Sequence, residues 1–177
     1  MKNIVAIIGT NAVGKTTLAR RIIEYAGGIS SIKDGVTYCC DNKTAVIGNY
    51  LEGKKIAGVD EFGETKFLSN KINSVDSEIV VFEGLKCGTF GLSIQSALFS
   101  GTDSLIIFLY ASAKVIQERL QKRSNKGIQS ASVLIQQKNN LRAAIKYKEI
   151  GVQVVSINTD ELTPEQIFNK VKYKIYK

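Results

Sequence analysis

The segment GTNAVGKT at residues 9–16 constrains the fold of this chain more than any other part of the sequence. It follows a short apolar run at 3–8, typical of a buried strand, and leads into residues 15–26, where Leu18, Ile22 and Ile23 have helical spacing. A glycine-rich loop that ends in Lys-Thr, between a strand and a helix, is the phosphate-loop or Walker A pattern. Its glycines allow a tight turn with N–H groups inward, and the helix adds its positive end. The sequence therefore predicts a site for a nucleoside triphosphate.

Three side chains of this loop have separate predicted roles. Lys15 is placed to reach the β- and γ-phosphates, the Thr16 hydroxyl is the expected ligand of a magnesium ion, and Thr17 is expected to support the α-phosphate. The predicted cofactors are therefore ATP and Mg²⁺. The full set of predicted nucleotide contacts is Gly9, Thr10, Asn11, Ala12, Val13, Gly14, Lys15, Thr16 and Thr17.

Composition excludes several classes of protein. A chain of 177 residues, 44% apolar and 23% charged, has the size and composition of one globular domain, predicted to span residues 1–177. The chain has no histidine, which excludes Ser-His-Asp and Cys-His nucleophile systems and histidine metal sites. A general base must then be a carboxylate or a lysine.

The cysteines and the first residues bear on location. Cys39, Cys40 and Cys87 form no CxxC pair and no even-numbered framework, which indicates a reducing, cytoplasmic setting. Residues 1–10 contain an apolar run that is too short for a signal peptide or a membrane span. We therefore expect neither secretion nor membrane anchoring.

Apolar runs alternate with helical patterns along the rest of the chain. Extended runs at 36–40 and 44–50, separated by a turn-forming stretch, predict a β-hairpin. Further strands are predicted by apolar runs at 78–84, 103–110 and 152–157. Helical patterns lie at 64–73, 90–100, 112–123 and 164–175, and a further one runs from the polar break at 124–130 to Glu149. Thr163 and Pro164 are expected to begin the helix at 164–175. This alternation predicts an α/β domain with a mostly parallel sheet.

The net charge of +8 is concentrated in the last third of the chain. Residues 1–110 hold 11 basic and 11 acidic side chains, whereas residues 111–177 hold 13 basic and 5 acidic ones. Such asymmetry favours a polyanionic partner, either nucleotide phosphates or a nucleic-acid backbone, with a solubilising surface as the alternative.

Glu83 ends the predicted strand at 78–84, where a carboxylate near the phosphate loop is placed to hold a magnesium-bound water. Together with Gly84 it resembles the Glu-Gly strand end of P-loop kinases of the nucleoside and nucleotide kinase group. Residues 103–127 also resemble that group, in which a buried strand precedes a helix whose arginines lead into a lid over the phosphates. Arg119 and Arg123 share a helix face. The resemblance implies that they stabilise charge on the transferring phosphoryl group.

The resemblance also implies a fold and a reaction. The expected fold is a three-layer P-loop kinase fold with a mostly parallel five-stranded sheet ordered 2-3-1-4-5, and the expected reaction is phosphoryl transfer to an acceptor hydroxyl or phosphate. The hairpin near 36–50 is predicted as an insertion beside this sheet, within an acceptor-side region at 36–63. Residues 119–130 are predicted to form a lid-like segment.

Three acids compete for the role of the base that accepts the proton of the attacking hydroxyl, namely Asp34, Asp60 and Glu61. Asp34 lies 19 residues after Lys15, close to where polynucleotide-kinase-like enzymes carry their base. Asp60 follows a glycine-flanked apolar stretch and is slightly favoured, because Asp34 precedes Gly35 in a turn-like setting where loop capping is common.

Residues 48–62 and 82–91 also resemble a phage-encoded branch of these kinases that phosphorylates 5-hydroxymethyluracil within DNA. This resemblance implies DNA as the acceptor, DNA modification as the role and the host cytoplasm as the location. A kinase of free nucleosides or nucleoside monophosphates is one alternative. A nucleic-acid-stimulated ATPase is another, because IAGVDE at 56–61 resembles the apolar run and Asp-Glu of motor ATPases, although Gly58 interrupts that run.

Overall fold

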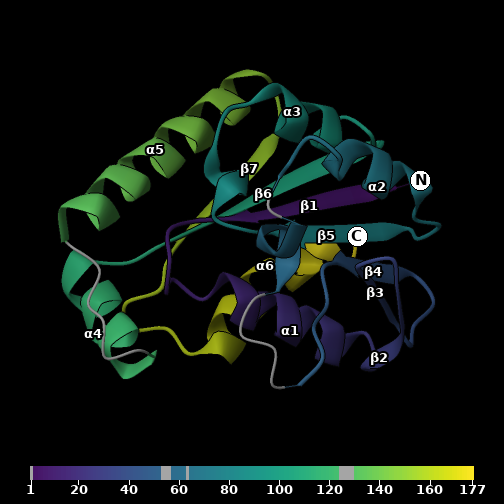
Figure 1. Ribbon diagram of the computed structural model, residues 1–177, viewed down its shortest axis with the longest axis horizontal. Helices are drawn as coiled ribbons and strands as arrows, with labels where there is room; N and C mark the ends of the chain where they lie inside the picture. The colour runs from purple at the N-terminus through teal and green to yellow at the C-terminus, as the bar shows by residue number, and fades with distance from the viewer. Residues whose placement is uncertain (1, 53–56, 63, 124–129) are drawn as a thin grey trace.

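The computed structural model describes residues 2–52, 57–62, 64–123 and 130–177 (Figure 1). Its strands are β1 (Asn3–Ile8), β2 (Ile29–Lys33), β3 (Val36–Cys39), β4 (Thr44–Ile47), β5 (Ile79–Glu83), β6 (Asp103–Tyr110) and β7 (Gln153–Asn158). Its α-helices are α1 (Lys15–Tyr25), α2 (Leu68–Ser74), α3 (Leu92–Leu98), α4 (Ala113–Arg123), α5 (Ser130–Glu149) and α6 (Pro164–Ile175). Of two short 3-10 helices, η1 (Gly58–Phe62) contacts β4 and β5, and η2 (Lys86–Gly88) contacts β1 and α5.

The strands form one sheet with the order β2-β3-β4-β5-β1-β6-β7. The pairs within β4-β5-β1-β6-β7 are parallel, whereas β3 is antiparallel to both β2 and β4. The predicted α/β class and mostly parallel sheet are confirmed. The prediction of a five-stranded sheet was wrong, because β2 and β3 extend one edge of the sheet to seven strands, so the full order differs from 2-3-1-4-5. The five parallel strands alone, counted along the chain, follow the predicted order.

The predicted hairpin near 36–50 exists as β3 and β4, but it is not an insertion beside the sheet. β4 pairs with β5 in parallel, from Thr44 opposite Ile79 to Ile47 opposite Phe82, and so belongs to the main sheet. A second hairpin joins β2 to β3 through Asp34 and Gly35, whose φ angles of 51° and 71° fit a type I′ turn. β2 was not predicted, because its residues are polar or exposed along most of the strand.

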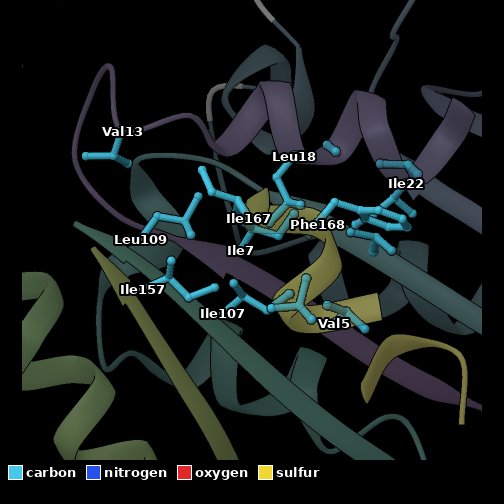
Figure 2. Packing of buried hydrophobic residues seen from close by; sticks show 14 of the residues in the cluster. Val5, Ile7, Val13, Leu18, Ile22, Ile107, Leu109, Ile157, Ile167 and Phe168 are labelled. Atoms are coloured by element: carbon cyan, nitrogen blue, oxygen red, sulfur yellow. The ribbon is translucent and has the colours of Figure 1, made fainter. Parts of the chain in front are cut away.

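Helices cover both faces of the sheet. Along β1, Val5 and Ile7 contact the layer that contains α1 and α6, while Ile4, Ala6 and Ile8 contact the layer that contains α2, α3 and α5. The first of these interfaces is shown in Figure 2, where β1 packs against Leu18, Ile22, Ile167 and Phe168. The alternation of inward side chains on β1 thus builds the two layers of the core on either side of one central strand.

The boundaries of several elements follow the sequence closely. β6 and α6 begin and end at the predicted residues, and α6 has the predicted capping box between Thr163 and Gln166. Within the apolar stretch at 56–62, residues Gly58–Phe62 form the 3-10 helix η1. Residues 119–123 of the predicted lid-like segment form the end of α4. Residues 124–129 of that segment lie outside the described residues, and so do residues 53–56 and 63 of the acceptor-side region. In the described residues no helix is long and apolar enough to cross a membrane.

We expect Gly48→Ala to destabilise the fold more than Gly151→Ala. Gly48 has a φ of 123° and Gly151 a φ of 87°, backbone angles that residues with a Cβ adopt only with strain. A Cβ on Gly48 would lie 2.4 Å from the backbone nitrogen of Gly58, whereas nothing lies within 4 Å of a Cβ on Gly151. In urea unfolding, Gly151→Ala should lower the free energy of unfolding by about 1 kcal/mol. The overlap at Gly48 should add about 1–3 kcal/mol. Equal losses in the two variants would contradict the close contact of these loops.

Candidate active site

The loop between β1 and α1 forms a tight turn at the end of the central strand. Gly9 has a φ of 149°, and a Cβ there would lie 2.4 Å from the carbonyl oxygen of Leu109 on β6, so only glycine fits. Gly14, with a φ of 99°, is the N-terminal capping residue of α1 and uses no side chain to cap it. The first N–H groups of α1 therefore keep their capacity to bind an anion.

Lys15 lies inside this loop. Its side chain is buried, with 7% of the residue exposed, and Nζ donates a hydrogen bond of 2.8 Å to the carbonyl oxygen of Thr10. Burial lowers the pKa of Lys15, and the negative charges of Glu83 and Asp60 partly oppose that shift. The ammonium group is thus held where a bound phosphate would replace the Thr10 carbonyl as its partner.

Glu83 ends β5 opposite the start of α1. It is 2% exposed, and its Oε1 accepts hydrogen bonds from the Thr16 hydroxyl at 2.8 Å and from the Tyr50 hydroxyl at 3.2 Å. Burial raises the pKa of Glu83 above its usual range, while Lys15 and the hydrogen bond from Thr16 act in the opposite direction. A carboxylate is thereby fixed beside the last residue of the phosphate loop.

The donor set beside this loop suits magnesium. The Thr16 hydroxyl donates a hydrogen bond to Glu83, so its oxygen lone pairs remain free to bind a metal ion. The carboxylate adds hard oxygen atoms of the kind that Mg²⁺ prefers. Among the described residues, no group of three or more His, Cys, Asp or Glu side chains could hold a metal ion by itself. With a nucleotide bound, Thr16 and Glu83 would hold a magnesium ion together with phosphate oxygens, as is usual for this ion.

Two adjacent cavities flank the phosphate loop. The first, which we call the phosphate-loop cavity, has a volume of about 390 Å³ and is lined by Asn11, Ala12, Gly14, Lys15, Thr16, Ala57, Asp60, Glu83, Leu85, Lys86 and Arg123. The second, which we call the lateral cavity, has a volume of about 240 Å³ and is lined by Ala12, Val13, Gly14, Thr17, Leu18, Arg119, Arg123, Thr159, Leu162, Pro164 and Ile167. The two cavities share Ala12, Gly14 and Arg123 and therefore adjoin each other.

The three candidate bases lie in different places. Asp60 lines the phosphate-loop cavity, and its carboxylate accepts hydrogen bonds from the backbone N–H groups of Leu85 at 2.7 Å and Lys86 at 3.4 Å. Asp34 is exposed in the turn between β2 and β3, and its carbonyl oxygen accepts a hydrogen bond from Lys71. Glu61 accepts a hydrogen bond of 3.0 Å from the backbone N–H of Asn49. Neither Asp34 nor Glu61 lines the two cavities.

The two predicted arginines of α4 differ in their surroundings. Arg119 donates to the carbonyl oxygen of Thr159 at 2.5 Å, to the Thr159 hydroxyl at 3.0 Å and to the carbonyl oxygen of Ala12 at 3.4 Å. It therefore ties α4 to the phosphate loop and lines only the lateral cavity. Arg123, one turn later, lines both cavities, and of the two arginines only Arg123 lies at the cavity that contains Lys15 and Glu83.

Sequence reasoning considered Tyr50 only as a stacking partner for a base, and it did not identify Lys86 or Thr159. Tyr50 lies in an extended run, and nothing in the sequence shows that its hydroxyl reaches the end of another strand. Thr159 directly follows β7, and the carboxyl ends of parallel strands are where ligands bind in open α/β sheets. That rule is a signal that would have found Thr159.

Comparisons with known proteins show similarity of structure only. No protein-family model matches the chain, and no curated protein matches it in sequence. Among solved structures, a sugar kinase from Janibacter sp. aligns with a TM-score of 0.60 at 17% identity, covering 99% of this chain and 96% of the other. A gluconokinase from Sinorhizobium meliloti aligns with a TM-score of 0.59 at 17% identity, covering 98% and 91%. The YorR protein of Bacillus subtilis, in complex with phosphorylated GDP, aligns with a TM-score of 0.61 at 13% identity, covering 97% and 95%. The chain therefore has the fold that these proteins share.

Proposed function

We propose that this chain is an ATP-dependent phosphotransferase that moves the γ-phosphate of ATP to a hydroxyl group of an acceptor. The observation that carries the proposal is that Lys15, Thr16 and Glu83 meet in one cavity at the start of α1, with 2.8 Å between the Thr16 hydroxyl and the Glu83 carboxylate. The shared fold supports it, since two of the similar structures described above are of named kinases and another contains a phosphorylated nucleotide.

The nucleotide would lie across the two cavities. Backbone N–H groups of residues 9–16 would hold its phosphates, and Lys15 would exchange the Thr10 carbonyl for the β- and γ-phosphates. Thr16 and Glu83 would hold a magnesium ion, which when bound neutralises charge on the phosphates. The lateral cavity, with Leu162, Pro164 and Ile167 in its wall, offers the nucleoside an apolar surface next to the loop.

The transfer step needs a base and positive charge at the phosphoryl group. In the proposed step, the acceptor oxygen forms a bond to the γ-phosphorus while the bond from that phosphorus to the β–γ bridging oxygen breaks, and ADP leaves. The proton of the acceptor hydroxyl passes to Asp60, which lines the phosphate-loop cavity and is held by two backbone N–H groups. Lys15 and Arg123 line the same cavity and would stabilise the charge on the transferring group.

The more specific proposal is that the acceptor is the hydroxymethyl group of 5-hydroxymethyluracil in DNA. A third cavity supports an extended acceptor: it has a volume of about 620 Å³ and contains Phe90, Arg142 and Lys146 in its wall. The loop at 85–90 joins it to the phosphate-loop cavity, because Leu85 lines one cavity and Phe90 the other. Cationic side chains bind backbone phosphates and an aromatic ring stacks on a base, so this surface suits a nucleic acid.

A small acceptor is the alternative proposal. The sugar kinase and the gluconokinase, by their names, act on small polyhydroxylated molecules, and the fold is shared with them. A nucleoside, a nucleoside monophosphate or a sugar would need only the space beside Asp60.

Transfer of label from γ-labelled ATP tests the reaction and its acceptor together. The acceptors to compare are DNA with and without 5-hydroxymethyluracil, free nucleosides, nucleoside monophosphates and gluconate. We expect label on the modified DNA, with a KM for DNA that rises steeply as salt increases, because phosphate contacts release counterions. Label on a small molecule alone would replace the DNA proposal, and DNA-stimulated release of phosphate without a labelled acceptor would favour an ATPase.

Lys15→Ala and Glu83→Gln should each reduce phosphoryl transfer by about 10²-fold or more. Each removes charge that is aimed at the phosphates or their metal ion, and one such group is worth about this factor in comparable sites. The matched control is Lys33→Ala, because Lys33 is an exposed lysine on β2. It should retain the activity of the wild type, measured by the same assay. Full activity of Lys15→Ala would refute the assignment of the site.

Asp60→Asn should abolish most of the transfer while affinity for the nucleotide, measured by calorimetry, changes little. Asparagine cannot accept the proton, but its carbonyl oxygen keeps an acceptor for the N–H of Leu85, at 2.7 Å from Asp60 Oδ2 in the wild type. Asp34→Asn is the matched control and should leave transfer near that of the wild type. The reverse pattern, with loss only in Asp34→Asn, would move the role of the base to the hairpin turn.

A further inference from the structure

Tyr50 is a buried tyrosine whose hydroxyl group reaches the candidate active site. The residue is 2% exposed, and its hydroxyl donates a hydrogen bond of 3.2 Å to Oε1 of Glu83. A buried tyrosine hydroxyl normally has a hydrogen-bond partner, and here that partner is the carboxylate proposed to hold the metal ion.

The two oxygens of the Glu83 carboxylate have different surroundings. Oε1 accepts hydrogen bonds from both Thr16 and Tyr50, and a Cβ added to Gly58 would lie only 2.7 Å from it. The backbone of η1 therefore closes the remaining side of Oε1. Oε2 accepts no hydrogen bond from the described part of the chain, although the residue lines the phosphate-loop cavity. Oε1 is therefore occupied by two hydrogen bonds, whereas Oε2 stays available to another ligand.

Tyr50 is itself held by two elements. Its N–H donates to the Thr37 hydroxyl on β3 at 3.3 Å, and that hydroxyl donates to the carbonyl oxygen of Gly48 at 2.7 Å. The carbonyl oxygen of Tyr50 accepts a hydrogen bond of 3.1 Å from Arg20 on α1, whose guanidinium lies 6.0 Å from the centre of the tyrosine ring. Contacts from β3 and α1 therefore restrict where the Tyr50 hydroxyl can lie.

We propose that Tyr50 is a positioning residue that holds Oε1 of Glu83, so that Oε2 is the oxygen presented to the magnesium–nucleotide complex in the phosphate-loop cavity. This inference rests on the proposed function and adds to it a residue that does not touch the nucleotide or the acceptor. Because Thr37 on β3 binds the backbone of Tyr50, β3 also helps to arrange the site. The sequence had predicted the hairpin that contains β3 as an insertion beside the sheet.

Tyr50→Phe tests this role, because it removes only the hydroxyl group. We expect the magnesium concentration for half-maximal activity to rise about 10-fold, the lower end of the usual effect of losing a partner of a metal ligand. Calorimetric titration with magnesium and a non-hydrolysable ATP analogue should show that magnesium strengthens nucleotide binding less in the variant than in the wild type, independently of activity.

Tyr38→Phe is the matched control, since Tyr38 lies on neighbouring β3 and its hydroxyl makes no hydrogen bond within the described residues. It should leave both the magnesium requirement and the calorimetric effect of magnesium unchanged. A folded Tyr50→Phe protein, as judged by thermal unfolding, with the magnesium requirement and the calorimetric effect of the wild type would overturn the proposal. So would a fall in kcat at all magnesium concentrations alike, which indicates a merely structural role. Failure of the proposed function is distinguishable, because the wild type would then transfer no phosphate to any acceptor.

Discussion

The buried carboxylate of Glu83 is the constraint on which the arrangement of the site depends. A charge at the end of β5 that is almost closed off from water is costly unless hydrogen bonds and an opposite charge compensate for it. Thr16 and Tyr50 supply the hydrogen bonds, and Lys15 supplies the charge. These partners come from the start of α1 and from the segment after β4, so one side chain links the phosphate loop to the strands beside it.

The order of the sheet explains how such distant segments meet. β1 lies between β5 and β6, so the loop after β1 is next to the ends of both strands. Much of this was predictable, because β5 and β6 are apolar runs buried along most of their length, and the start of α6 is encoded in Thr163 and Pro164. β2 was not predicted because its side chains are largely exposed and carry no apolar alternation. The Asp34-Gly35 pair was a signal for this hairpin that strand periodicity alone does not provide.

The candidate site was predictable where a local pattern defines it. The phosphate loop needs only consecutive residues and a strand and helix around it, and Glu83 needs only a strand end. Contacts between distant segments leave no such pattern. The hydrogen bond from Tyr50 to Glu83 joins two distant segments, and Arg119 and Arg123 differ in the cavities that they line. Spacing along one helix or strand predicts neither of these features. The roles of Asp60 and of the arginines therefore stay predictions.

Calorimetric titration with a non-hydrolysable ATP analogue and magnesium examines the phosphate site itself, because it requires neither an acceptor nor a base. We expect saturable binding of one nucleotide per chain that magnesium strengthens, since Thr16 and Glu83 would hold the ion beside the phosphates. No heat of binding in a folded protein, or binding that magnesium leaves unchanged, would contradict it.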